Sequence, residues 1–212
     1  MTERPRGRKP NTRRPAEILD AATAEFAEKG FAGARMDDVA ARLGVVRGTL
    51  YRYFANKESL FRAVVEQTMV PHIEALRTIS LEEANSLPRL LCGLVGPMTA
   101  IAGETPLGGV LKMVVGEARN FPELARIWHD QVMAPAVEVL AVAIAEAQAR
   151  REARPGDPRA YAFQVLSPLV TALIWRETFV PVGSPDFELQ PLLAQCVETF
   201  LDGVLSGAPR DR

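Results

Sequence analysis

Residues 44–60 read GVVRGTLYRYFANKESL and carry the most specific pattern of this 212-residue chain. Gly44 suits a tight turn that requires a positive φ. The residues after it predict a short helix over about 47–53, and Asn56 is a favourable cap for a long helix that follows. Leu50 and Phe54 are four residues apart on the short helix, so we expect both to turn inward together.

The other side chains of the short helix form a polar outer face. They are Arg47, Gly48, Thr49, Arg52 and Tyr53. Arginine pairs with guanine, threonine offers a hydroxyl or a methyl group, and glycine lets the backbone approach closely. Tyr51 and Tyr53 suit phosphate contacts. Lys57 lies in the first turn of the next helix, beside free backbone N–H groups that favour an anion.

A preceding helix over about 37–43 completes this pattern, with small Ala40 at the expected contact between the two helices. Val39 and Leu43 share its inward face with Leu50 and Phe54. In a helix-turn-helix the second helix lies in the DNA major groove while the first braces it across the backbone. The pattern therefore predicts a helix-turn-helix that binds DNA.

Charge is distributed unevenly along the chain. Residues 1–62 hold 13 Lys/Arg against 8 Asp/Glu, a net charge of +5, whereas residues 63–212 hold 12 against 18, a net of −6. This asymmetry indicates a module that faces a polyanion, attached to a body with another role. Chance scatter of surface charge is the alternative explanation of the asymmetry.

Helix signals run through the whole chain, and strand signals are nearly absent. We expect an all-α fold of about nine helices. The first covers about 13–29 and stops at Gly30, and a fourth follows Asn56 to about 78. Further helices are expected over about 106–119, 122–154 with a kink at Pro135, 158–179 with an interruption at Pro168, and 186–206. Residues 81–104 carry a helical pattern broken by Gly93, Gly96 and Pro97.

Composition limits the other classes of function. The hydrophobic content of 48% supports a full core, and we expect no window apolar enough to span a membrane. The N-terminus lacks an apolar signal region, which favours a cytoplasmic protein. Cys92 and Cys196 are too few for a disulfide framework and are expected to be buried structural thiols. No cofactor motif is found, and His72 and His129 have no partner at helical spacing for a metal site, so both are expected at the surface or at a pocket rim.

With these residues in view, positions 13–61 resemble the DNA-binding domain of TetR-family transcriptional regulators. The resemblance rests on Gly44-Val45-x-x-Gly48-Thr49-Leu50-Tyr51-x-Tyr53-Phe54-x-x-Lys57-Glu58-x-Leu60 and on upstream residues that fit the same pattern. The latter are Ile18-Leu19-Asp20-Ala21-Ala22, Phe26, Gly30 and Met36-x-Asp38-Val39-Ala40. Clear motif similarity covers about a quarter of the chain.

Two positions depart from that family's pattern. The family usually has Ser or Thr where this chain has Val46 and Arg35, capping the recognition helix and the helix before it. Loss of such a cap typically costs about 1 kcal/mol. We therefore expect a less well anchored recognition helix. Arg35 either replaces the hydroxyl with a charged phosphate contact or is a solvated surface arginine.

The resemblance implies three segments. Residues 1–12 form a basic disordered arm, 13–60 the helix-turn-helix domain, and 61–207 a helical effector-binding and dimerisation domain. Within the arm, Pro5-Arg6-Gly7-Arg8-Lys9-Pro10 resembles an AT-hook, whose arginines enter a narrow minor groove. A disordered basic tail that only raises non-specific affinity is the alternative.

The resemblance also implies a homodimer, double-stranded DNA and a small-molecule effector as partners, with no membrane. The expected dimer face on the last two long helices comprises Val165, Leu166, Leu169, Leu173, Leu193, Val197 and Leu201, with an intrachain core as the alternative. The expected pocket residues are Met98, Met113, Trp128, His129, Met133, Phe163 and Trp175, with simple core packing as the alternative.

These features favour a ligand-responsive regulator, most simply a repressor that an effector releases from a palindromic operator. A DNA-binding architectural protein without an effector is the second hypothesis, supported by the basic arm. A helical enzyme is the third. It is disfavoured because the sequence shows no paired acid/base constellation and no Gly-rich phosphate loop.

Overall fold

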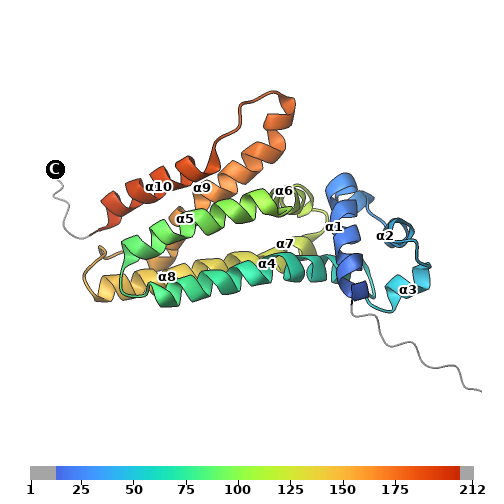
Figure 1. Ribbon diagram of the computed structural model, residues 1–212, viewed down its shortest axis with the longest axis horizontal. Coiled ribbons are helices and arrows are strands. Elements are labelled where there is room, and N and C mark those ends of the chain that lie inside the picture. Colours follow the sequence, from blue (N-terminus) through green and yellow to red (C-terminus); the bar gives the residue numbers. More distant parts are fainter. Residues whose placement is uncertain (1–12, 206–212) are drawn as a thin grey trace, which may run out of the picture. The chain divides into compact units, whose positions relative to one another are not determined.

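The computed structural model describes residues 13–205, and this part of the chain is helical with no β-strand (Figure 1). The all-α expectation is therefore confirmed. Contacts divide the chain after Val64 into two compact units, called unit 1 and unit 2, and each is described by itself. The predicted basic arm, 1–12, with its AT-hook-like segment, lies outside the described residues.

Unit 1 contains α1 (Arg13–Gly33), α2 (Met36–Arg42), α3 (Arg47–Tyr51) and the first turns of α4 (Lys57–Glu82). Gly30, the predicted helix stop, has φ 68° and ψ 177° and breaks the regular geometry of α1. The rings of Phe26, Phe31 and Phe61 pack around one another with centroids 5.7–5.8 Å apart. These rings, together with buried Leu50, form the core of unit 1.

Ion pairs join α1 to α2. Glu25 is only 1% exposed, and its carboxylate lies 2.6 Å from Lys29 Nζ and 3.1 Å from an Arg42 nitrogen. Lys29 also contacts Asp38 at 2.8 Å, and Arg42 contacts Glu28 at 2.5 Å. The two cations thus each bridge a buried carboxylate and a more exposed one, which fixes the first helix against the helix that precedes the turn.

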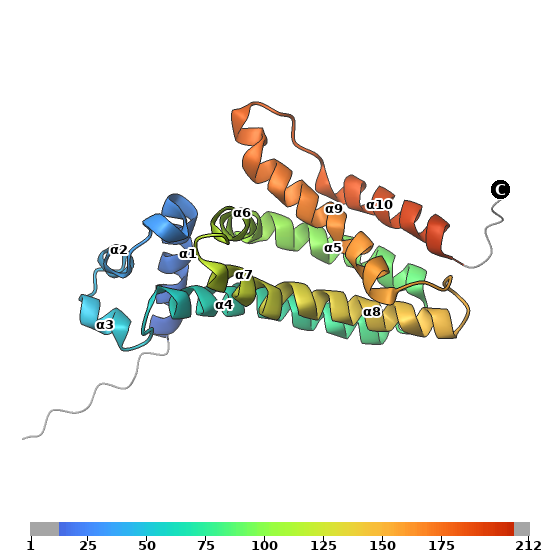
Figure 2. The same ribbon diagram turned by 180° about the vertical axis from the view of Figure 1, so that it is seen from behind.

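Unit 2 contains the rest of α4 and the elements that follow it. They are α5 (Leu87–Glu104), α6 (Leu107–Glu117), α7 (Pro122–Trp128), a π-helical turn (His129–Met133), α8 (Ala134–Ala149), α9 (Pro158–Thr178), a 3-10 turn (Val180–Val182) and α10 (Leu189–Val204). Helix α8 packs along α9, and α10 packs against α5 and α9 (Figures 1 and 2).

Three predicted interruptions differ from the structure. The expected helix over 122–154 ends at Ala149. It is interrupted by the π turn and not by a kink at Pro135, because Pro135 lies in the first turn of α8. A proline is tolerated there because the missing N–H falls among groups that lack a helical partner. Helix α9 runs without a break through Pro168, and α5 accommodates Gly93, Gly96 and Pro97. Tertiary packing outweighs the local preference of these residues.

The expectation that no window is apolar enough for a membrane span is wrong. Pro122–Ala149 and Pro158–Val182 are both long and apolar enough by length and composition, and 39% and 11% of their most apolar windows are buried. Helices α8 and α9 are apolar on more than one side because they pack against each other and also line a cavity described below.

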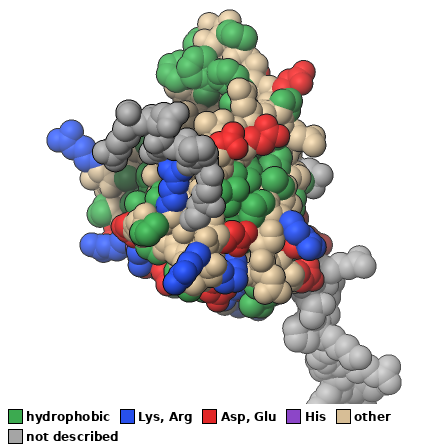
Figure 3. Space-filling view, turned by 90° about the vertical axis from the view of Figure 1, so that its left-hand side faces the viewer, with side chains coloured by type: hydrophobic (Ala, Val, Ile, Leu, Met, Phe, Trp, Pro, Cys, Tyr) green, Lys and Arg blue, Asp and Glu red, His purple; other side chains and the backbone are tan. Residues whose placement is uncertain are grey.

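Apolar side chains also reach the surface of unit 2. Phe163, Phe179 and Phe187 are exposed on α9 and on the segment between α9 and α10. On the face that Figure 3 presents, basic and acidic side chains are interspersed and apolar side chains lie between them. The prediction of buried thiols is wrong, since Cys92 is exposed and Cys196 is half-buried.

Candidate nucleic-acid interface and ligand cavity

The turn between α2 and α3 has the geometry that Gly44 predicts. Gly44 has φ +65°, and its N–H donates to Ala41 O at 3.0 Å, while Val45 N–H donates to Ala40 O at 3.0 Å. Val39 and Leu50 are buried on the inner side, as predicted. Leu43 and Phe54 are half-buried. The inward residues therefore hold α3 against α2 and orient its other face outward.

Helix α3 ends at Tyr51, two residues before the predicted end, so the side chains predicted to contact DNA lie on α3 and on the turn that follows it. Arg47, Gly48, Tyr51, Arg52 and Tyr53 are exposed, and Thr49 is half-buried. Arg35, which precedes α2, is exposed as well. These residues are free to meet a ligand from solvent, and their contact with DNA stays a prediction.

Arg47 is held in place by neighbours within unit 1. Its Nε lies 3.0 Å from Asp37 Oδ1, a second guanidinium nitrogen donates to Asp37 Oδ2 at 3.1 Å, and a third donates to the Tyr51 hydroxyl at 3.2 Å. The hydrogen bond to Tyr51 and the charge of Asp37 raise the pKa of Arg47 above its usual value. Sequence reasoning missed Asp37, because ten residues and a turn separate it from Arg47.

Lys57 has hydrogen-bond partners within unit 1 that the sequence did not indicate, while its contact with a phosphate stays untested. Its Nζ donates to the carbonyl oxygens of Phe31 at 2.5 Å and Ala34 at 3.0 Å, and it lies 4.4 Å from the centroid of the Phe31 ring. Lys57 was predicted to contact a phosphate, but the structure commits its ammonium group to the carbonyl end of α1. A cation is favourable at that end because helix carbonyls there lack partners.

The two missing caps are confirmed. Val46 precedes α3 and Arg35 precedes α2, both with extended backbone, and neither side chain caps its helix. Asn56 does cap α4 as predicted, since its Oδ1 accepts the Ser59 N–H at 2.7 Å. The recognition helix is thus anchored by Leu50 and by the Arg47–Asp37 pair rather than by an N-terminal hydroxyl.

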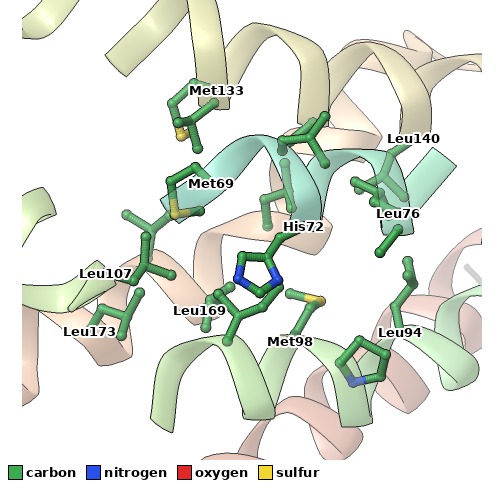
Figure 4. A pocket seen from close by; sticks show the side chains of 18 of the residues that line it. Met69, His72, Leu76, Leu94, Met98, Leu107, Met133, Leu140, Leu169 and Leu173 are labelled. Atoms are coloured by element: carbon green, nitrogen blue, oxygen red, sulfur yellow. The ribbon is translucent and has the colours of Figure 1, made fainter. Parts of the chain in front are cut away.

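Unit 2 contains an apolar cavity of about 240 Å³ that is partly open to the surface. Helices α4, α5, α6, α7, α8 and α9 and the π turn contribute to its wall. His72 on α4 presents its imidazole toward the labelled apolar side chains in Figure 4. The volume exceeds that of a cavity which binds benzene, about 150 Å³, and lies near the lower end for ligand pockets.

Three of the seven predicted pocket residues line this cavity: Met98, Trp128 and Met133. The other four do not belong to its lining. Met113 is buried on α6, His129 is exposed and contacts Asp130 at 2.8 Å, and Phe163 is exposed. Trp175 donates its Nε1–H to Pro185 O at 3.0 Å on another side of α9. Hydrophobic character alone does not reveal which way a helical side chain points.

The predicted dimer-face residues are buried or half-buried within the chain. Leu166, Leu169 and Leu173 line the cavity, and the remaining four, Val165, Leu193, Val197 and Leu201, are buried. These residues thus make contacts within the chain, and their part in a dimer face stays a prediction. The stripes on α9 and α10 face the unit's own core because these helices pack on each other, on α5 and, through α9, on α8.

No cluster of three or more His, Cys, Asp or Glu that could hold a metal ion occurs among residues 13–205. Of the two histidines, His129 is at the surface and His72 lies in the cavity wall. The two candidate sites are therefore an exposed segment with Arg and Tyr side chains in unit 1 and a partly open apolar cavity in unit 2.

A helix-turn-helix unit joined to an all-helical unit defines this chain as a DNA-binding regulator. The family described as bacterial regulatory proteins, tetR family, matches residues 18–64, and that described as AefR-like transcriptional repressor, C-terminal domain, matches residues 94–203. The chain belongs to the TetR family of transcriptional regulators.

Curated relatives match this chain over very different shares of its length. The HTH-type transcriptional repressor SCO4008 of Streptomyces coelicolor is 46% identical over 26% of this chain and 29% of its own length. The fatty acid metabolism regulator protein of Bacillus subtilis is 29% identical over 46% of this chain and 50% of its length. The chain thus matches half or less of these two relatives. UidR of Escherichia coli is 24% identical over 90% of this chain and 92% of its length.

Solved structures share the fold. A TetR-family protein from Mesorhizobium loti superposes with a TM-score of 0.76 at 23% identity, covering 94% of this chain and 100% of the other. The SmeT–triclosan complex gives 0.76 at 20% identity, with 93% and 98% covered. FadR from Bacillus subtilis in complex with stearoyl-CoA gives 0.73 at 20% identity, with 89% and 98% covered.

Proposed function

We propose that this protein is a cytoplasmic, dimeric repressor that binds a palindromic operator and leaves it when a small apolar molecule occupies the cavity of unit 2. The observation that carries this proposal is that one helix serves both sites. Lys57 and Phe61 of α4 hold unit 1 together, and Met69, His72 and Ile79 of the same helix line the cavity.

The DNA contacts follow from the outer face of α3. Arg47 and Arg52 reach base edges or phosphates, Thr49 and Gly48 allow close approach, and Tyr51 and Tyr53 contact phosphates. Arg35 adds a phosphate contact from the start of α2. Lys57 is left out of this set, because its ammonium group already binds carbonyl oxygens of α1.

Coupling between the sites requires that a ligand discriminate between two conformations. A molecule in the cavity contacts α4 over more than two turns, from Met69 to Ile79. If the occupied cavity favours an α4 position that DNA disfavours, ligand weakens DNA binding and DNA weakens ligand binding by the same factor. The complexes of SmeT with triclosan and of FadR with stearoyl-CoA support a ligand in this fold.

A dimer matches the exposed side of α9 and α10 rather than the buried stripes predicted at first. Only 11% of the apolar window of α9 is buried within the chain, and Phe163 is 59% exposed. A groove between the two helices is lined by apolar and small side chains, including Trp175, Phe187 and Leu192. A second copy that covers this surface gives two recognition helices for a palindromic site.

Fluorescence anisotropy with a labelled duplex tests the DNA-binding part. The duplex comes from the region upstream of the protein's own gene, with a shuffled duplex of equal length beside it. We expect affinity to fall steeply between about 50 and 200 mM salt, and to fall about tenfold for Arg47→Ala or Arg52→Ala. Arg126→Ala on α7 is the matched control. Flat salt dependence with no loss in the α3 variants would contradict the proposal.

The second hypothesis, an architectural DNA-binding protein without an effector, makes a different prediction. A thermal-shift screen of small hydrophobic compounds separates the two, since a ligand that prefers the native state raises the unfolding temperature. Compounds that stabilise the protein and lower its DNA affinity support the ligand-responsive repressor. The apolar cavity favours this outcome, because a concave and mainly apolar lining is typical of sites that bind small hydrophobic molecules.

A further inference from the structure

His72 is an isolated polar group in the wall of the apolar cavity. The residues that line the cavity include no Lys, Arg, Asp or Glu among the described part of the chain, and nearly all are aliphatic or Met side chains. His72 is half-buried, and within residues 13–205 no hydrogen bond or ion pair gives its imidazole a partner. Figure 4 shows the His72 ring near the side chains of Met98 and Leu169, which line the same cavity.

His72 is half-buried and its ring nitrogens still meet solvent, but a ligand that fills the cavity displaces that water, so the imidazole then needs a partner on the ligand. A buried donor or acceptor that is left without a hydrogen-bond partner destabilises the complex by about 1–3 kcal/mol. An imidazole offers one N–H donor and one acceptor nitrogen, so a single hydroxyl can satisfy either atom. Trp128, which also lines the cavity, has an Nε1 atom that is buried without a hydrogen-bond partner.

The same lining excludes a strongly charged ligand. Moving an isolated anion into an apolar space is unfavourable unless a cation pairs with it, and the described lining holds no Lys or Arg, the side chains that carry a permanent positive charge. The volume of about 240 Å³ also limits the ligand to a compact one. The lack of Lys and Arg in the described lining and the small volume both make this cavity unsuited to the phosphate groups of an acyl-coenzyme A.

We infer that the effector is a compact, uncharged, mainly hydrophobic molecule with one hydroxyl group, and that His72 is the residue that selects it by hydrogen bonding to that hydroxyl. The inference rests on the proposed ligand-responsive function and specifies the ligand class of its cavity. Sites that hydrogen-bond a ligand hydroxyl discriminate against analogues without it, because the protein's polar group is then left unpaired.

Three bicyclic probes of similar size test this inference: 2-naphthol, naphthalene and 2-naphthoate. The chain has two tryptophans, and Trp128 lies in the cavity wall, so the Trp175→Phe variant leaves one fluorescent reporter of cavity binding. We expect 2-naphthol to bind about tenfold more tightly than naphthalene, and 2-naphthoate to bind more weakly than 2-naphthol.

The His72→Leu variant is then compared in the same background. We expect 2-naphthol to lose its advantage while naphthalene binds as before, which also shows that the variant is folded. His72→Gln, which keeps a hydrogen-bonding group, should retain part of the preference. Equal binding of naphthol and naphthalene in the parent protein, an undiminished preference in His72→Leu, or no binding of any probe would overturn the inference.

A DNA-release assay with the same compounds separates this inference from the proposed function. If 2-naphthol binds through His72 but leaves DNA affinity unchanged, the repressor mechanism fails and the ligand class stands. If compounds release DNA equally from the parent protein and from His72→Leu, the repressor mechanism stands and the role of His72 is refuted.

Discussion

At the scale of single residues, Asp37 binds the guanidinium group of Arg47, which is a side chain proposed to contact DNA bases. It neutralises Arg47 through two nitrogen–oxygen contacts of 3.0 and 3.1 Å. We expect Asp37→Asn to raise affinity for any duplex about threefold at low salt, since a negative charge near the phosphates is removed. Glu17→Gln on α1 removes an equal charge elsewhere. Weaker and less sequence-specific binding by Asp37→Asn would instead show that Asp37 positions Arg47 for base recognition.

Substitutions of Lys57 and Arg52 are expected to affect different properties, the first the stability of the fold and the second the affinity for DNA. Lys57→Met removes a charged donor from the carbonyl oxygens of Phe31 and Ala34. We expect it to lower the free energy of unfolding by about 2 kcal/mol, measured by urea denaturation. Arg52→Gln should leave that free energy unchanged and reduce DNA affinity. If Lys57→Met is as stable as the parent protein but binds DNA poorly, Lys57 contacts a phosphate, as the sequence predicted.

At the scale of elements, the α1–α2 ion pairs predict how unit 1 responds to acid. The hydrogen bond from Arg42 lowers the pKa of Glu28 below its ordinary 4.5, and that from Lys29 lowers the pKa of Asp38 below 3.8. A group whose pKa is lower in the folded state stabilises the fold above its unfolded pKa. That contribution is lost as pH falls through the folded pKa.

Thermal unfolding from pH 7 to about pH 3 checks this behaviour. Glu28→Gln should lower the unfolding temperature slightly at pH 7, and its curve should converge with that of the parent protein below pH 4.5. The effect is small because the Glu28 carboxylate is solvent-exposed. A constant difference at all pH values would show that lost packing, rather than charge, causes the change.

At the scale of the whole molecule, the exposed side of α9 predicts the assembly. Phe163→Glu places a charge on the proposed dimer surface, whereas Val115→Glu changes an equally exposed position on α6, 60% against 59% exposed. Sedimentation equilibrium should give about twice the chain mass of 23.2 kDa for the parent protein and for Val115→Glu. It should give the single-chain mass for Phe163→Glu. Dimers of undiminished stability in Phe163→Glu would exclude this face.

The helix-turn-helix could be predicted from sequence because its information is local. Gly44 requires a positive φ, the spacing of Leu50 and Phe54 defines an inward face, and Asn56 caps the next helix, all within one short segment. The family resemblance rests on the same residues. The outward face of α3 was predicted for the same reason, since it is what the inward residues leave exposed.

The partners of side chains in unit 1, and the direction in which the helix faces of unit 2 point, depend on segments far apart in the sequence. Lys57 binds carbonyls 23 and 26 residues earlier in the chain, so its role is invisible to spacing along α4. The apolar stripe of Leu166, Leu169 and Leu173 is equally compatible with a core, a dimer face and a cavity wall, and only the packing of six helices assigns it to the cavity. Local patterns thus establish the helices and the DNA-reading motif, whereas contacts between remote helices establish the cavity and the place of His72 within it.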